Sequence, residues 1–125
     1  MRVKNENLLD ISGPVDLASN ANLPAVWLGH IANYSIQLVF TGTPNGNFTL
    51  QASNDQGSIN SAGAAQQVTN IENWTTVADS AIVVSAAGDA MWTVENAGYN
   101  WVRVVWTAVG GSGSLTSARC YVKGI

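Results

Sequence analysis

Apolar and polar side chains alternate with a period of two along much of the chain, which is the pattern of β-strands that bury one face. Two such runs cover residues 34–40 and 47–53, and the segment between them contains the turn-favouring dipeptide Asn45-Gly46. We therefore expect a β-hairpin here. Its inward-facing side chains are Tyr34, Ile36, Leu38, Phe40, Phe48, Leu50 and Ala52.

A second and stronger alternation covers residues 99–108 and 115–123, which are joined by the glycine-rich segment 109–114. It predicts a second hairpin with a flexible tip. The even-numbered positions of both arms are apolar, and we expect their side chains to meet in the core: Val102, Val104, Trp106, Ala118, Cys120 and Val122.

The opposite face of this second hairpin combines aromatic and basic side chains, namely Tyr99, Trp101, Arg103, Arg119, Tyr121 and Lys123. A cation beside an aromatic ring gains about 0.5–1 kcal/mol at an exposed site, so this face can be a self-contained cross-strand ladder. It can also be an interface, because Trp, Tyr and Arg are enriched at binding hot spots. The candidate interface or ligand-binding residues are Trp101, Arg103, Arg119, Tyr121, Lys123 and Trp74.

Shorter β-type runs cover residues 74–78, 81–85 and 91–95, and turn-forming residues separate them. Strands at this spacing favour a β-sandwich or a β-barrel. We expect one domain, with an N-terminal arm and edge strands in residues 1–32 and the sandwich core in residues 33–125. The arm either pairs along the edge of its own domain or lies on a neighbouring subunit.

Residues 54–73 are rich in Gly, Ser, Asn and Gln and predict a long loop. Long structureless loops inside compact domains are uncommon and often functional, so this loop is a candidate contact element. A solvated connector is the other interpretation.

Charged residues are rare in this chain. Hydrophobic residues make up 46% and Asp, Glu, Lys and Arg only 10%, against about 25% charged residues in typical soluble domains. A weakly charged polar surface repels its neighbours little, which favours close association between subunits. Because the net charge is −3 and only five residues are basic, we expect no nucleic-acid partner.

Targeting signals are not evident. The first residues are not followed by the apolar run of a secretory signal, and no apolar stretch is long enough to cross a membrane. We therefore expect neither export nor a membrane partner. Cys120 is the only cysteine, so an intrachain disulfide cannot form, which fits a reducing compartment.

Residues suited to catalysis or metal binding are scarce. His30 is the only histidine, no nucleophile motif accompanies it, and it lies far in sequence from Cys120, without the close spacing of zinc ligands. Asp55 and Asp89 do not follow the calcium-loop pattern. The glycines of segment 109–114 precede no helix and no lysine that would hold a phosphate. We expect no enzyme, no catalytic residue, no metal site and no cofactor.

Several segments of the chain carry a family resemblance. The run Tyr-Ser-Ile-Gln-Leu-Val-Phe-Thr-Gly-Thr-Pro-Asn-Gly-Asn-Phe-Thr-Leu-Gln-Ala-Ser-Asn-Asp begins at Tyr34, and later come Asn73-Trp74-Thr75, Trp92, Tyr99-x-Trp-Val-Arg-Val-x-Trp-Thr and Gly111-Ser-Gly-Ser-Leu. In these segments the sequence resembles a group of small phage virion proteins. The resemblance implies a jelly-roll-like antiparallel β-sandwich of about eight strands. It also implies a structural protein that decorates or cements a capsid, or that belongs to a tail or fibre.

The partners and location that this resemblance implies are a second copy of the chain and a major capsid or tail protein, in a virion assembled in the host cytoplasm. The same segments are also similar to galactose-binding-like sandwiches of the discoidin type, through the pattern Phe-x-Leu-Gln-x-Ser-x-Asp that begins at Phe48. That similarity implies an alternative, a carbohydrate-binding module of a tail or spike that grips a surface glycan with exposed aromatic rings. Those secreted domains are often stapled by disulfides and carry a signal peptide, whereas this chain has the single Cys120 and no evident signal, and this favours the virion protein.

Overall fold

Two long strands, β5 (Ala32–Ser53) and β11 (Trp101–Gly124), pair antiparallel along their whole lengths. The computed structural model describes residues 3–9, 14–28, 32–55, 58–59, 65–67 and 73–124, and their regular secondary structure is entirely β-strand. The shorter strands are β1 (Val3–Asn7), β2 (Val15–Asp16), β3 (Ala21–Asn22), β4 (Val26–Trp27), β6 (Ser58–Ile59), β7 (Ala65–Gln67), β8 (Thr75–Thr76), β9 (Ile82–Val84) and β10 (Gly88–Ala97).

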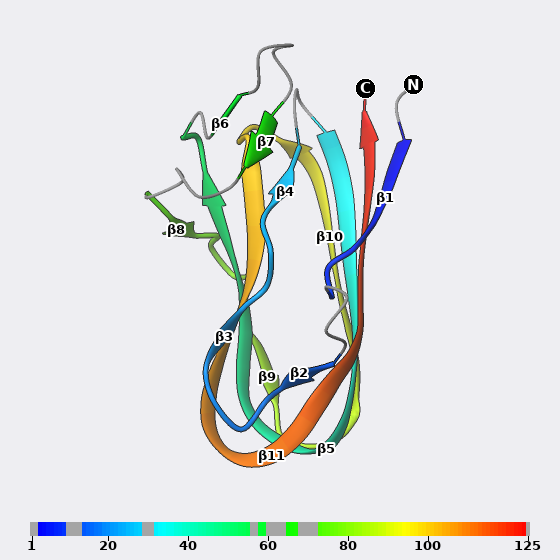
Figure 1. Ribbon diagram of the computed structural model, residues 1–125, viewed down its shortest axis with the longest axis vertical. Coiled ribbons are helices and arrows are strands. Elements are labelled where there is room, and N and C mark those ends of the chain that lie inside the picture. Colours follow the sequence, from blue (N-terminus) through cyan, green and yellow to red (C-terminus); the bar gives the residue numbers. More distant parts are fainter. Residues whose placement is uncertain are drawn as a thin grey trace.

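The ribbon formed by β5 and β11 folds back on itself near its middle, as Figure 1 shows. The N-terminal half of β5 and the C-terminal half of β11 form a first layer, with β10 beside β5 and β1 beside β11. The other two halves form a second layer, with β8 and β9 beside β5 and with β3 and β4 beside β11. The fold is an all-β antiparallel β-sandwich, as the alternation predicted. Its jelly-roll-like connectivity stays a prediction.

The core lies between the two layers and joins side chains from both. Phe48 of the second layer packs against Phe40, with ring centroids 5.7 Å apart, and against Trp106, with centroids 4.5 Å apart. The side chains that the alternation placed inward are buried, apart from the half-buried Ala52, and the prediction is thereby confirmed for Tyr34, Ile36, Leu38, Phe40, Phe48, Leu50, Val102, Val104, Trp106, Ala118, Cys120 and Val122.

The two predicted hairpins were wrong. Segments 41–46 and 109–114 do not reverse the chain but continue β5 and β11, and they pair with each other. Gly42 lies opposite Gly113, and Pro44 lies opposite Gly111. The residues that suggested turns are therefore found where the ribbon bends, because a sharp bend needs the same conformational freedom as a turn.

Two glycines at this bend allow the strands to approach closely. Gly42 and Gly111 have φ angles of +84° and +71°, in the left-handed region that favours glycine. A Cβ atom on Gly111 would also overlap the backbone oxygen of Thr43 on the partner strand. The bend thus depends on small residues on both strands.

Hydrogen bonds of buried side chains hold the layers in register. The Trp92 indole N–H, from β10 of the first layer, donates to the backbone oxygen of Ser80 at 2.7 Å. The Ser80 hydroxyl accepts the Leu50 backbone N–H at 3.0 Å, in the second layer. Since an unpaired buried N–H costs about 1–3 kcal/mol, these bonds specify which parts of the two layers face each other.

Tyr34 is a buried polar residue at one end of the sandwich. Its hydroxyl lies 2.6 Å from the hydroxyl of Tyr99, which is in the turn between β10 and β11, and the two rings meet edge to face. Burial of the side chain raises the pKa of Tyr34 above the ordinary tyrosine value, and this hydrogen bond raises it further by a smaller amount. The neutral phenol is therefore the form that the folded protein favours.

The outer segments of the chain are partly described. β1 to β4 all pair with β11, so the N-terminal strands border the sheet, and the division between an arm and a core at residue 32 stays a prediction. The expected loop 54–73 contains β6 and β7, which pair with each other, while the rest of it between residues 56 and 72 lies outside the described residues. His30 also lies outside them.

We predict that Gly111→Ala destabilises the protein by about 2–3 kcal/mol, because the new Cβ meets backbone on the opposite strand and the residue keeps a strained positive φ. Gly98→Ala is the matched control, since no atom lies within 4 Å of the position its Cβ would take. Urea unfolding followed by circular dichroism measures both. Equal unfolding free energies for the two variants would contradict the role of the bend.

We also predict that the wild-type protein loses stability above about pH 10, where tyrosine ionises in the unfolded chain. The pKa of Tyr34 is raised in the folded state. The contribution of the neutral Tyr34 side chain to the free energy of unfolding is therefore complete below about pH 10, and above it this contribution falls by up to about 1.4 kcal/mol for each further pH unit. Tyr34→Phe should decline less steeply. Urea unfolding at several alkaline pH values compares the two slopes, and identical slopes would refute the assignment.

Candidate functional site

The predicted aromatic and basic face is two faces in the structure. Trp101 and Arg103 lie on the outer side of the second layer, whereas Arg119, Tyr121 and Lys123 lie on the outer side of the first layer. The expectation of one continuous face was wrong, because β11 passes through the bend between these two groups (Figure 1). Each layer therefore presents its own candidate surface.

Trp101 is covered on the second-layer outer face, with only 2% of its surface exposed. Its ring lies 5.0 Å from the ring of Trp27, its partner on β4, and its indole N–H donates to the backbone oxygen of Asp55 at 3.0 Å. It does not belong to the core cluster between the layers. Its packed position leaves no ring face free for a ligand.

Arg103 forms a cation–π pair with Trp74, which lies outside the two arms on which the sequence predicted such pairs. The guanidinium carbon lies 4.2 Å from the centre of the Trp74 ring, and two guanidinium nitrogens donate to the side-chain oxygen of Gln51, at 2.9 Å and 2.6 Å. Partial burial lowers the pKa of Arg103 from its ordinary value. This part of the surface has the contacts of a self-contained ladder.

Asp55 also connects the two ends of the segment from residue 56 to residue 72. Its carboxylate accepts the Asn73 backbone N–H at 2.9 Å and the Asn73 side-chain amide at 3.1 Å. These bonds join Asp55 to Asn73, the residues before and after segment 56–72, beside Trp101. Sequence reasoning did not identify Asp55 or Trp27 as parts of this cluster, because their contacts depend on the pairing of β4 and β5 with β11.

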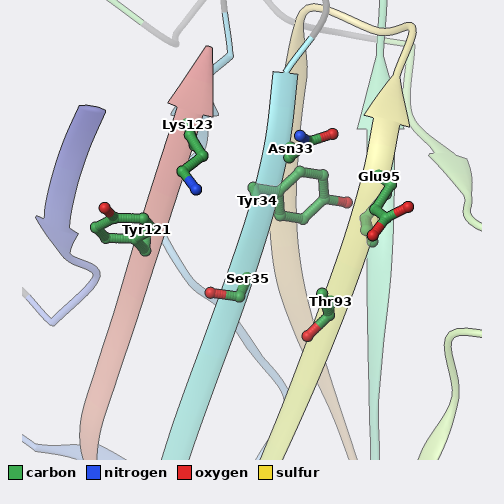
Figure 2. Close-up of a pocket in the computed structure, with 8 residues that line it drawn as sticks. Asn33, Tyr34, Ser35, Thr93, Glu95, Tyr121 and Lys123 are labelled. Carbon is green, nitrogen blue, oxygen red and sulfur yellow. The ribbon is translucent and has the colours of Figure 1, made fainter. Parts of the chain in front are cut away.

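The first-layer outer face is an array of cross-strand rows. One row runs from Tyr121 on β11 through Ser35 on β5 to Thr93 on β10. In the next row Lys123 lies opposite Asn33, and Figure 2 shows Lys123 and Glu95 on either side of Asn33. These side chains line a shallow groove of about 240 Å³, which is smaller than the usual 300–1,000 Å³ of a small-molecule site.

Large apolar side chains are exposed on the same face. Tyr121 has 41% of its surface exposed, Met91 on β10 has 53% and Val39 on β5 has 37%. Their side chains point outward because side chains alternate along a strand, and the residues before and after each of them are buried or half-buried. Sequence reasoning missed Met91 and Val39, although the alternation in residues 89–95 and 34–40 contained the signal.

Charge on this face is divided between strands. Arg119 and Lys123 are exposed on β11, whereas Asp89 and Glu95 are exposed on β10, on the other side of β5. Within the described residues, these four side chains have no hydrogen bond or ion pair. The face therefore has a basic side, a neutral centre and an acidic side.

The described residues contain no group of three or more His, Cys, Asp or Glu side chains that could hold a metal ion. None of the described segments is a helix with the length and hydropathy needed to cross a membrane.

Comparison with known proteins identifies the fold. No family model matches the chain, and no curated protein matches it. Among solved structures, the SPBc2 prophage-derived protein YomS aligns over 98% of this chain and 94% of its own, with a TM-score of 0.54 and 12% identity. At this identity the likeness shows a shared fold, which extends over nearly the whole of both chains.

Two further solved structures align less well. One is from Bacillus endospore appendages, described as a novel family of disulfide-linked pili, with a TM-score of 0.46, 15% identity, and coverage of 98% of this chain and 88% of that chain. The other is from the Gx strain of infectious bursal disease virus, with a TM-score of 0.49, 15% identity, and coverage of 97% of this chain but 32% of that chain. Neither adds to the fold assignment.

We predict that Trp74 and Arg103 are energetically coupled by about 0.5–1 kcal/mol, the usual strength of an exposed cation–π pair. A double-mutant cycle with Trp74→Ala, Arg103→Met and the double variant measures this coupling from urea unfolding. Val83→Ala replaces Trp74→Ala in a control cycle, because Val83 is 82% exposed on β9 and has no part in the pair. A coupling energy near zero in the first cycle would contradict the ladder.

Proposed function

We propose that this chain is a non-enzymatic structural protein of a phage particle, which decorates or cements the capsid through protein–protein contacts. The observation that carries the proposal is the fold shared with a prophage-derived protein over 98% of this chain. The resemblance of the segments around Phe48 and Trp101 to small phage virion proteins supports the same function independently of the fold.

The character of the surface agrees with a role in assembly. A protein with 10% charged residues pays little electrostatic cost when its faces meet other subunits. The exposed apolar side chains of Val39, Met91 and Tyr121 lie on one sheet face, where a second surface can cover them. We therefore propose partners of two kinds, a second copy of the chain and a major capsid or tail protein.

A carbohydrate-binding module of a tail or spike is the alternative, and it has less support. A sugar ring needs an exposed aromatic face, but Trp101 is 2% exposed and the Trp74 ring already carries the Arg103 guanidinium. Tyr121 is the best exposed of the aromatic candidates. Binding to a glycan array that is lost in Tyr121→Ala, with no binding to particles, would favour this alternative.

We predict that the chain is a stoichiometric component of the particle that its genome encodes. Mass spectrometry of purified particles should find it in a fixed copy number. Heads from a mutant that lacks the gene should bind the purified chain saturably to the same copy number, measured by co-sedimentation.

Heads that already contain the chain are the control, because their sites are occupied. Particles that lack the chain altogether would refute a structural role. Binding to isolated tails but not to heads would keep the structural role and remove the decoration of the capsid.

A further inference from the structure

We propose that the first-layer outer face binds a second copy of this chain, face to face, around a two-fold axis parallel to β5. This inference rests on the proposed function and names the self-association surface that it requires. The contacting face consists of the outward residues of β11, β5 and β10.

Charge complementarity selects both the partner and the axis. Rotation by 180° about a line along β5 places the basic side of one copy over the acidic side of the other, because β11 and β10 lie on opposite sides of β5. Rotation about a line across the strands would instead place β11 over β11 and bring Arg119 and Lys123 near their own copies. Only the first arrangement pairs opposite charges.

The register of the strands makes the pairing specific. Lys123 lies opposite Asn33, and Glu95 follows Val94, which lies opposite Tyr34, at the start of a β-bulge between Val94 and Ala97. Lys123 and Glu95 are thus at nearly the same height on either side of β5, as Figure 2 shows. The strand-parallel axis brings Lys123 of each copy over Glu95 of the other, so that two equivalent ion pairs form.

The rest of the face matches in the same arrangement. Val39 lies on the central strand and meets its own copy across the axis, and Gln37 does the same with its amide. Arg119 lies in the row of Met91 and one row from Asp89, so its aliphatic part can cover the Met91 side chain while its guanidinium reaches Asp89. The apolar and charged side chains both find complementary neighbours.

The size of the overlapping face fits a weak dimer. Because the axis runs along β5, the three strands β11, β5 and β10 of each copy overlap, and β1 lies outside the contact. Three strands about 4.8 Å apart and eight residues long, at about 3.3 Å for each residue, cover roughly 380 Å² on each copy. The roughly 760 Å² buried on both copies is in the range of weak, transient contacts, so the dimer forms at high protein concentration. Two sheets packed in this way lie about 10 Å apart, with their strands within about 30° of parallel.

A charge-swap experiment on the full chain tests the proposal. Lys123→Glu and Glu95→Lys should each weaken self-association roughly tenfold at low ionic strength, because both symmetry-related contacts change from attraction to repulsion. An equimolar mixture of the two variants should regain wild-type association, since each contact then joins a lysine to a glutamate. The double variant Lys123→Glu/Glu95→Lys should also regain it. Analytical ultracentrifugation measures all five samples.

Val83→Lys is the matched control for an added surface charge, because Val83 is 82% exposed on β9 in the second layer. It should associate as the wild type does. Circular dichroism and urea unfolding confirm that each variant keeps its fold, which the exposed positions of Lys123 and Glu95 favour.

A second measurement locates the contact directly. A carbodiimide joins carboxylates to amines without a spacer, and in a dimer of mixed ¹⁴N and ¹⁵N chains it should yield a Lys123–Glu95 cross-linked peptide that carries both isotopes. If every Lys123–Glu95 peptide carried a single isotope, the contact would lie within one chain and the proposal would be overturned.

Other outcomes separate this proposal from the proposed function. A wild-type chain that stays monomeric at high concentration, or single variants that associate as tightly as the wild type, would overturn the face-to-face dimer. If such a chain still binds heads, the structural function stands and a capsid protein occupies the face. If the dimer forms as described but particles lack the chain, the structural function fails and the dimer stands.

Discussion

The antiparallel pairing of β5 with β11 is the constraint on which the other parts of the structure depend. The two strands pair from residues 32 and 124 at one end to residues 53 and 101 at the other. Because the ribbon folds back near its middle, the same two strands supply the centre of both layers. The short strands β1 to β4 then add to β11, and β8, β9 and β10 add to β5, whereas β6 and β7 pair with each other in a separate sheet.

In this fold the strictest steric constraint lies at the bend of the ribbon. The apolar side chains on either side of it, such as Phe40 and Phe48, enter one core only if the ribbon turns sharply between them. Gly42, Gly111 and Gly113 let the paired backbones turn without a clash. The bend also separates the outward residues of β11 onto opposite sides of the sandwich, so a change in bend geometry would move both candidate surfaces.

The sequence predicted which side chains face inward but not which strands pair. Alternation is a local property, and it correctly placed Val104 and Cys120 in the core. Asn45-Gly46 and the glycines of segment 109–114 fit a tight turn and a bent ribbon equally well, because both need residues without steric restriction. Only the long-range pairing distinguishes the two, and no pattern within one segment records it.

The same limit applies to the candidate surfaces. The sequence predicted aromatic partners for Arg103 on the opposite arm of a hairpin, whereas its aromatic partner is Trp74 from a distant segment. The outward direction of Glu95 and Asp89 is readable from alternation in β10, whereas their position across β5 from Lys123 and Arg119 follows from strand order alone. A charge on a strand becomes informative about binding only once its neighbours across the sheet are known.

The two outer faces differ in how far their polar groups are satisfied. On the second layer, Arg103 has Gln51 and Trp74, and Trp101 has the Asp55 backbone oxygen, so a partner there would have to replace existing contacts. On the first layer, Lys123 and Glu95 have no such contacts within the described residues, and apolar side chains lie exposed between them. Binding gains the most free energy where new contacts form without the loss of old ones. The first layer is therefore the face from which association gains more.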